Sequence, residues 1–304
     1  VWVLFSWLAN MGNDPEDLVR DLQRLDKASW RKAYALTNQL RDPEHDALKD
    51  DAALCRDLAA ALESENESAK SPRERTKLRV FLCRALGEFR VPDGLDPLVE
   101  AASKQRHDND IQVRRAALEA LSVLSDTLGA QVIREHDGAL DVILKASRTV
   151  DDDDRASQQA MLRSTAAFTL GVVGGPAALN RLVQMIDDSY SDARYNAAIG
   201  LARHGHLASV PVLLEMLDPR TLLALEGVST EAGREFKRSL VLANGIRAAK
   251  ELAASTGDRS AAEVAQLHSA LSALAEDVTI PRRVRLEAKA AIIEWPSTKA
   301  AVEL

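Results

Sequence analysis

Residues 108–121 read DNDIQVRRAALEAL, a short polar turn followed by Arg residues and an Ala/Leu-rich helical stretch. Three further segments place an Arg at the start of a similar stretch, with small and large aliphatic residues on one face: LRVFLCRALG (78–87), LRSTAAFTLG (162–171) and ARYNAAIGL (193–201). Recurrence of one helical segment predicts a repeat protein. A single copy cannot bury its apolar stripe, so the copies are expected to stack on one another.

The spacing between the copies separates two kinds of helical repeat. Their Arg residues, at positions 79, 114, 163 and 194, are irregularly spaced. Tetratricopeptide and ankyrin arrays keep a period of about 33 or 34 residues. The irregular spacing therefore favours a looser stack of helical hairpins.

The turn before Arg114 resembles the turn and second-helix start of HEAT repeats. DNDIQVR (108–114) has the D-x-D-x-x-V-R pattern of that family, followed by its Ala-Ala-x-x-Ala-Leu run. DSYSDAR (188–194) matches it at the first Asp and the Arg, with Ala in place of Val and its second Asp two residues later. The two other copies keep the helix but have Arg73 and Ser157 at the position of the first Asp. The resemblance implies an all-α fold, a right-handed α-solenoid of stacked antiparallel helix pairs.

The Asp and Arg residues of the pattern have a structural explanation. An Asp in the turn can accept backbone N–H groups, and an Arg can reach a carboxylate of its own or the adjacent repeat. Such a ladder would set the register between repeats, which we favour over a role as ligand contacts. The expected ladder consists of Arg79, Asp108, Asp110, Arg114, Arg163, Asp188, Asp192 and Arg194.

Composition agrees with an all-helical fold. Hydrophobic residues make up 46% of the chain and aromatic residues only 4%, so Ala, Leu and Val carry the apolar fraction. This composition suits close helix packing better than sheets.

We expect one elongated solenoid domain over 13–304, clearest over 78–218. Capping and stop signals predict its helices over 14–26, 29–41, 47–63, 72–90, 94–104, 110–128, 137–149, 155–173, 176–187, 191–204, 207–217, 232–254, 260–277 and 281–295. Residues 63–72 are polar and predict a solvated loop.

Residues 1–12 form an apolar N-terminal stub, VWVLFSWLANMG, without a charged side chain. At about 1.5 Å per helical residue the stub is too short to span a bilayer. We expect it to be the end of a transmembrane helix, with Trp2, Phe5 and Trp7 near the membrane–water interface. An apolar cap on the first repeat, an unusual start codon and a processed signal segment are the alternatives.

Charge limits the classes of partner. The net charge of −7 argues against a main surface that follows nucleic-acid phosphates, although a local basic face is compatible with it. Two basic clusters stand out, and each is a candidate site for an acidic partner or anion if it is not simply a solvated face. The clusters are Arg73, Arg75, Lys77, Arg79, Arg84 and Arg90, and Arg282, Arg283 and Arg285.

Motifs for catalysis, cofactors and metals are missing from the sequence. It contains no Gly-x-Gly-x-x-Gly, phosphate-binding loop, Cys-x-x-Cys, His-Glu-x-x-His or Gly-x-Ser-x-Gly motif. We therefore expect no enzyme activity, no cofactor and no metal, and we name no catalytic residue. Cys55 and Cys83 lie at apolar helical positions and are expected in the core.

Three functions are compatible with these observations. The first, which HEAT repeats most often imply, is a non-catalytic protein–protein interaction scaffold, membrane-associated through its N-terminus or otherwise cytoplasmic. The second is an enzyme or accessory of the bilin-lyase type; a HEAT-like DNA glycosylase is disfavoured by the acidic balance and the scarcity of aromatic residues. The third is a structural subunit of a larger assembly. A surface groove would favour the scaffold, and a deep pocket would favour ligand chemistry. A broad apolar flank would favour a fixed subunit.

Overall fold

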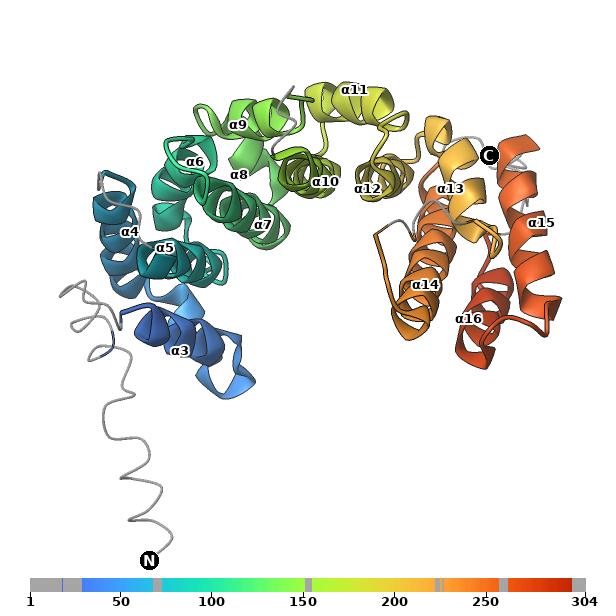
Figure 1. Cartoon of the computed structure of the whole chain (residues 1–304), viewed down its shortest axis with the longest axis horizontal. Coiled ribbons are helices and arrows are strands. Elements are labelled where there is room, and N and C mark those ends of the chain that lie inside the picture. The colour runs from blue at the N-terminus through green and yellow to red at the C-terminus, as the bar shows by residue number, and fades with distance from the viewer. Residues whose placement is uncertain are drawn as a thin grey trace, which may run out of the picture. The chain divides into compact units, whose positions relative to one another are not determined.

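The computed structural model describes residues 18, 29–67, 73–150, 155–221, 225, 227–256 and 262–296. Within these ranges every regular element is a helix. The chain divides into two compact units, Val1–Val173 and Gly174–Leu304. Both have the all-α, HEAT-like solenoid organisation that the sequence predicts, because each helix packs on helices that lie close to it in the chain (Figure 1).

The first unit is built from two layers of helices. In one layer α3, α5, α7 and α10 contact one another in that order, and α4, α6 and α9 form the other. The elements are α3 (Ser29–Arg41), η1 (Pro43–Asp50), α4 (Ala52–Glu67), α5 (Arg73–Leu86), η2 (Pro92–Gly94), α6 (Leu95–Ser103), α7 (Asp110–Leu128), α8 (Ala130–Glu135), α9 (Ala139–Ala146) and α10 (Ala156–Val173).

The second unit repeats this arrangement. Helices α12, α14 and α16 contact one another in order, and α13 packs on α15. Its apolar core includes the fully buried Leu213, Leu267 and Leu271. The elements are α11 (Pro176–Met185), α12 (Ser191–Arg203), η4 (Leu207–Ser209), α13 (Val210–Leu217), α14 (Glu231–Ser255), α15 (Ala262–Glu276) and α16 (Arg282–Ile293).

Small residues allow the helices to approach closely. A Cβ atom on Gly87 would lie 2.9 Å from both Cα and Cβ of Ala120, so the end of α5 meets the backbone of α7 at this point. Such a distance is shorter than real Cβ contacts, and only Gly fits here without a shift of the backbone.

Two expected helix boundaries are wrong near α4. The helix expected over 47–63 is a 3-10 helix followed by α4, because Asp51 Oδ1 accepts hydrogen bonds from the backbone N–H groups of Ala53 and Leu54 and starts a new helix. Helix α4 also continues to Glu67, into the segment expected to be a solvated loop. The short helix α8 was not expected.

The two cysteines are buried, as expected, in α4 and α5. Burial raises the pKa of both the Cys55 and the Cys83 thiol to about 12. Both are therefore protonated, unreactive core residues near neutral pH.

The expected membrane stub, with Trp2, Phe5 and Trp7, lies outside the described residues, as does the helix expected over 14–26 apart from Leu18. Among the helices that are described, none is both long and apolar enough to cross a membrane.

Candidate functional site

The structure places two of the predicted ladder residues in a buried ion pair between successive repeats. Arg79 on α5 contacts Asp110 at the start of α7, with 2.9 Å between Nη2 and Oδ1 and side chains 3% and 1% exposed. Asp110 Oδ2 also accepts hydrogen bonds from the backbone N–H groups of Arg106 and His107, at 2.8 and 2.9 Å. Burial raises the pKa of Asp110, but these donors and Arg79 outweigh it, so the pKa lies below its usual value and Asp110 is ionised.

Arg114 and Arg194 mainly close the turn that precedes their own helix. Arg114 Nε donates to Ala102 O in the last turn of α6, at 3.0 Å. Arg194 Nη1 donates to Asp188 O at 2.7 Å, and its Nη2 donates to Glu215 Oε1 on α13 at 2.8 Å. These two arginines therefore tie a helix to the end of the preceding one or to the helix that follows.

The other ladder residues are more dispersed. Asp108 is 84% exposed and pairs with Arg155, with 3.1 Å between Oδ1 and Nη1. Asp188 Oδ1 accepts from the backbone N–H of Tyr190. Asp192 pairs with Lys237 on α14 at 3.2 Å. Arg163 is buried on α10.

Sequence reasoning missed the polar residues at the end of α4. Glu65 and Asn66 are buried, although the polar segment around them predicts a solvated loop. Glu65 pairs with Arg75, and Asn66 Nδ2 donates to Pro97 O at 3.2 Å. Burial raises the pKa of Glu65 despite the nearby guanidinium groups of Arg75 and Arg79. The basic cluster that follows in the sequence could have indicated that Glu65 is buried, since a buried carboxylate needs a cationic partner.

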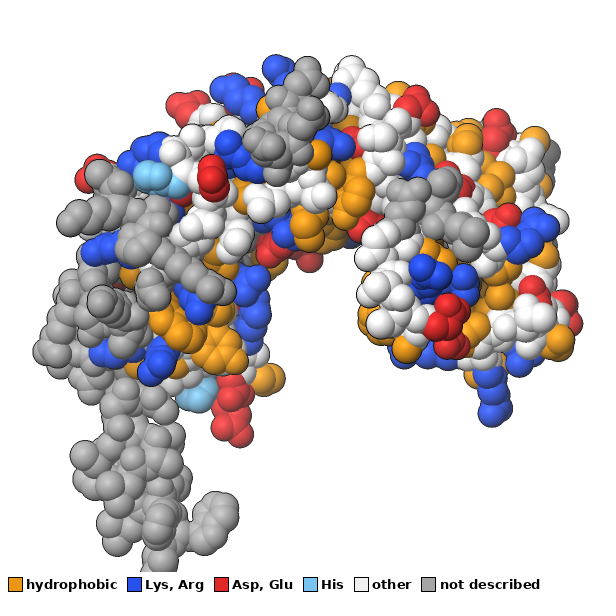
Figure 2. All heavy atoms as spheres, viewed as in Figure 1, with side chains coloured by type: hydrophobic (Ala, Val, Ile, Leu, Met, Phe, Trp, Pro, Cys, Tyr) orange, Lys and Arg blue, Asp and Glu red, His pale blue; other side chains and the backbone are white. Residues whose placement is uncertain are grey.

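An aromatic cluster lies on the layer formed by α3 and α5. Trp30 stacks on Phe81 with ring centroids 6.3 Å apart, and Tyr34 meets Phe81 edge-on at 5.2 Å. Lys77 Nζ lies 4.8 Å from the centroid of Trp30, and Arg84 lies 5.6 Å from that of Phe81. Cations at these distances are attracted to the ring faces. Figure 2 shows hydrophobic side chains beside Lys and Arg over these helices.

A groove of about 330 Å³ adjoins this cluster between α5, α7 and α10. Arg84 and Arg115 line it together with Val80, Ile111 and Met161. Arg115 is held in place by a 3.3 Å hydrogen bond from its Nε to Thr165 Oγ1. The groove thus combines apolar walls with fixed guanidinium groups.

Further exposed apolar side chains continue along the same layer. Met161 and Phe168 are 41% and 43% exposed and lie two helical turns apart on α10, so they share one face. We call the whole surface the aromatic–basic face and define it as Trp30, Tyr34, Lys77, Phe81, Arg84, Arg115, Met161 and Phe168. Its formal charge is positive although the chain carries −7.

Metal-ligating side chains do not gather in the described part of the chain. No group of three or more His, Cys, Asp or Glu residues there is placed to hold a metal ion.

Comparison with known proteins identifies the repeats. Residues 155–224, from the start of α10 to beyond α13, match the family model described as HEAT repeats. These residues are HEAT repeats. The resemblance in the sequence is thus confirmed for this HEAT segment, which contains the Arg163 and Arg194 copies. No curated protein matches the chain.

Two solved structures resemble the chain. Human deoxyhypusine hydroxylase, solved in complex with glycerol, is 18% identical with a TM-score of 0.32, and the match covers 94% of this chain and 98% of that one. An engineered protein is 17% identical with a TM-score of 0.31, over 92% and 88% of the two chains. At these values neither structure carries an inference about the function of this chain.

Proposed function

We propose that this HEAT-repeat protein is a non-catalytic scaffold that binds a protein partner on the aromatic–basic face. The partner segment is acidic and carries apolar side chains as anchors. Its carboxylates pair with Lys77, Arg84 and Arg115, and its anchors pack on Trp30, Phe81 and the apolar walls of the groove.

The observation that carries this proposal is the coincidence of cations with aromatic side chains that are half-buried, as Trp30 and Phe81 are, or exposed, as Tyr34 and Phe168 are. Aromatic and Arg residues dominate the binding energy of protein interfaces. Arg84 and Arg115 are half-buried beside the groove, and Glu119 is the acidic residue that lines it. A positive face attracts acidic partners.

The strongly buried titratable groups support a non-catalytic role. Asp110 is engaged by Arg79, Glu65 by Arg75, and Tyr195 by Glu215 with 2.7 Å between its hydroxyl and Oε1. These groups are held by structural partners inside the helix stack. The observation that bears on the alternative of an enzyme accessory is the pocket of about 1060 Å³ in the second unit, which is described below.

A random-peptide display library provides the test. We expect selected peptides to combine Asp or Glu with aromatic or aliphatic residues. Replacing Arg84 and Arg115 by Glu should lower their affinity, measured by isothermal titration calorimetry, by at least about tenfold per charge reversal. The matched control reverses two arginines of the second unit, Arg203→Glu and Arg247→Glu, and should leave the affinity unchanged.

Three outcomes would contradict the proposal. The selected peptides could lack acidic residues, the control variant could lose as much affinity as the Arg84 and Arg115 variant, or single-stranded DNA could bind more tightly than any peptide. Each result would exclude an acidic protein partner on this face. Circular dichroism of all variants checks that the fold is intact.

We also propose that residues 1–12 hold the protein at a membrane. Their apolar, charge-free sequence and the aromatic residues Trp2, Phe5 and Trp7 support this. After cell fractionation and an alkaline carbonate wash, we expect the product of the full reading frame to stay with membranes and a chain beginning at Gly12 to be released. Solubility of both would overturn the tether and leave the aromatic–basic face unaffected.

A further inference from the structure

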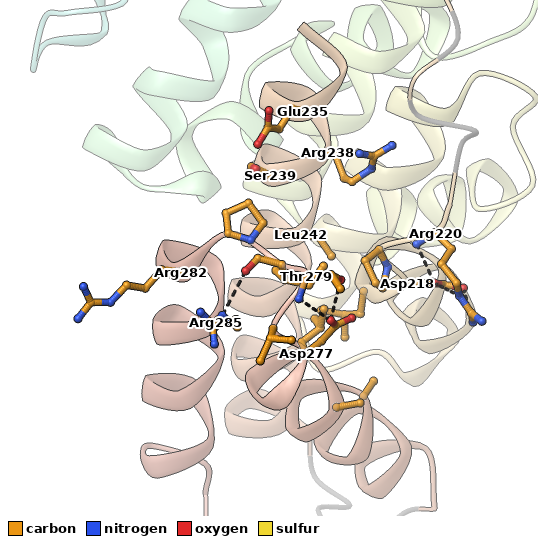
Figure 3. Close-up of a pocket in the computed structure, with 18 of the residues that line it drawn as sticks. Asp218, Arg220, Glu235, Arg238, Ser239, Leu242, Asp277, Thr279, Arg282 and Arg285 are labelled. Atoms are coloured by element: carbon orange, nitrogen blue, oxygen red, sulfur yellow. Dashed lines mark hydrogen bonds and ion pairs between the residues drawn. The ribbon is translucent and has the colours of Figure 1, made fainter. Parts of the chain in front are cut away.

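The second unit contains a pocket of about 1060 Å³ that the proposed scaffold does not use. Residues from α13, α14, α15 and α16 line it (Figure 3). Its apolar wall is formed by Leu214, Leu217, Leu242, Leu274 and Ile280. The size suits a small organic molecule, and the wall would bury a hydrocarbon group.

Two of the acidic residues in the pocket already have hydrogen-bond partners, and one of them, Asp218, has its charge balanced by an arginine. Asp218 accepts both Nε and Nη2 of Arg220, at 3.0 and 3.2 Å, and this pairing lowers its pKa. Asp277 accepts from the hydroxyl and backbone N–H of Thr279, at 2.6 and 2.9 Å, which lowers its pKa in turn. The remaining carboxylates, Glu231 and Glu235, are exposed on the first turns of α14.

The basic residues retain donors for a ligand. The Nε atom of Arg238 is buried and has no hydrogen-bond partner in the described structure. A buried donor without an acceptor costs free energy, and a bound anion would remove that cost. Arg285 Nε donates a hydrogen bond to Ile280 O at 3.2 Å, and none of the described hydrogen bonds uses the Nη groups of Arg285. Figure 3 shows Arg238 and Arg285 on opposite sides of the pocket.

The start of α16 provides further hydrogen-bond donors. Its N-cap residue is Pro281, which provides no side-chain cap, and Pro281, Arg282 and Arg285 all line the pocket. The free N–H groups of a helix N-terminus attract anions. Arg282 itself points away from the pocket centre in Figure 3.

We propose that this pocket binds an amphiphilic organic anion, with its carboxylate or phosphate held by Arg238 and its hydrocarbon part against the leucine wall. Of the basic cluster at 282–285, Arg282 and Arg285 line this pocket. This site is independent of the aromatic–basic face, because it lies wholly in the other unit.

Calorimetric titration of the full chain with octyl phosphate tests the proposal. We expect saturable binding, with octanol and inorganic phosphate each at least about tenfold weaker, because each supplies only half of the contacts. Arg238→Leu should weaken octyl phosphate binding on the order of tenfold. Arg238→Lys keeps the charge but removes Nε. Its affinity for octyl phosphate should therefore lie between that of the unchanged chain and that of Arg238→Leu.

The matched control is Arg247→Leu on the same helix. Arg247 donates to Asn244 and does not line the pocket, so the variant should bind octyl phosphate like the unchanged chain. Equal binding by Arg238→Leu and the unchanged chain, or equal affinity for octanol and octyl phosphate, would overturn the proposal. Thermal unfolding confirms that each variant is folded.

A second arm distinguishes a free ligand from a lipid in a bilayer. The pocket walls surround the ligand on several sides, so we commit to a free amphiphile. Vesicles containing phosphatidic acid should not bind the chain beginning at Gly12, whereas octyl phosphate should. Vesicle binding that Arg238→Leu abolishes would instead assign the pocket to a membrane lipid and overturn the free-ligand proposal.

Discussion

Replacing Asp110 by Ala is expected to lower the free energy of unfolding by about 3–5 kcal/mol. The change leaves Arg79 buried, at 3% side-chain exposure, without this carboxylate. It also removes the acceptor of two backbone N–H groups, those of Arg106 and His107. Removing one partner of a buried ion pair costs far more than losing an exposed pair.

Urea denaturation followed by circular dichroism measures this effect. The matched control is Asp93→Ala, which breaks a pair with the 61% exposed Arg56. Because water screens that pair, the control should lose at most about 1 kcal/mol. Similar losses in the two variants would show that the buried pair does not hold the repeats together.

The pH dependence has a defined sign. Because the pKa of Asp110 is lowered in the folded chain, its contribution is fully present above the unfolded value near 3.8. The contribution is lost as the pH falls through the lower, folded value. The difference in stability between the unchanged chain and Asp110→Ala should therefore be constant from pH 7 to about pH 4 and shrink below that.

Replacing Gly87 by Val should lower the free energy of unfolding by about 2–3 kcal/mol, in the upper part of the range for overpacked cores. At an unstrained position with free space, Gly to Ala usually stabilises a protein by about 0.4–1 kcal/mol. Gly87 has no such space, because its Cβ would lie 2.9 Å from the backbone of Ala120. Helices α5 and α7 would have to move apart along their buried contact.

A second substitution provides the control for Gly87. Ala120→Gly removes one of the two atoms that the new side chain meets, so Gly87→Ala should be less damaging in its presence. Unfolding of the two single variants and the double variant gives the coupling energy of the pair. Additive effects would exclude the close contact between α5 and α7.

The local signals in the sequence predicted much of the secondary structure. Helix α7 has the expected bounds, with Gly129 directly after it, and α11 begins at the expected Pro176. These signals act over a few residues, because caps, Pro and Gly change backbone energies close to where they occur. The sequence also predicted the all-α fold, since stacking is the way for the repeated Arg and Ala/Leu segments to bury their apolar faces.

The sequence predicted the type of contact between distant residues but not which residues make each contact. A ladder of Arg and Asp residues was expected, but its partners differ among repeats: Arg79 reaches Asp110, whereas Arg114 reaches the carbonyl of Ala102. Which acceptor an Arg reaches depends on how two helices are offset, and a long flexible side chain fits several offsets. Glu65 looked like a loop residue because its partner, Arg75, lies on the next helix, α5, and the local pattern does not define that contact.

The amino-acid sequence alone predicts a stack of HEAT-like helices with basic clusters on an acidic chain. What those clusters adjoin depends on the folding of the chain: Trp30 and Phe81, far apart in the sequence, stack beside Lys77, and Arg238 lines a pocket with Arg285. This difference follows from the range of the forces involved. Helix formation depends on neighbours within one or two turns, whereas a binding surface requires side chains from several helices, and packing alone sets their distances.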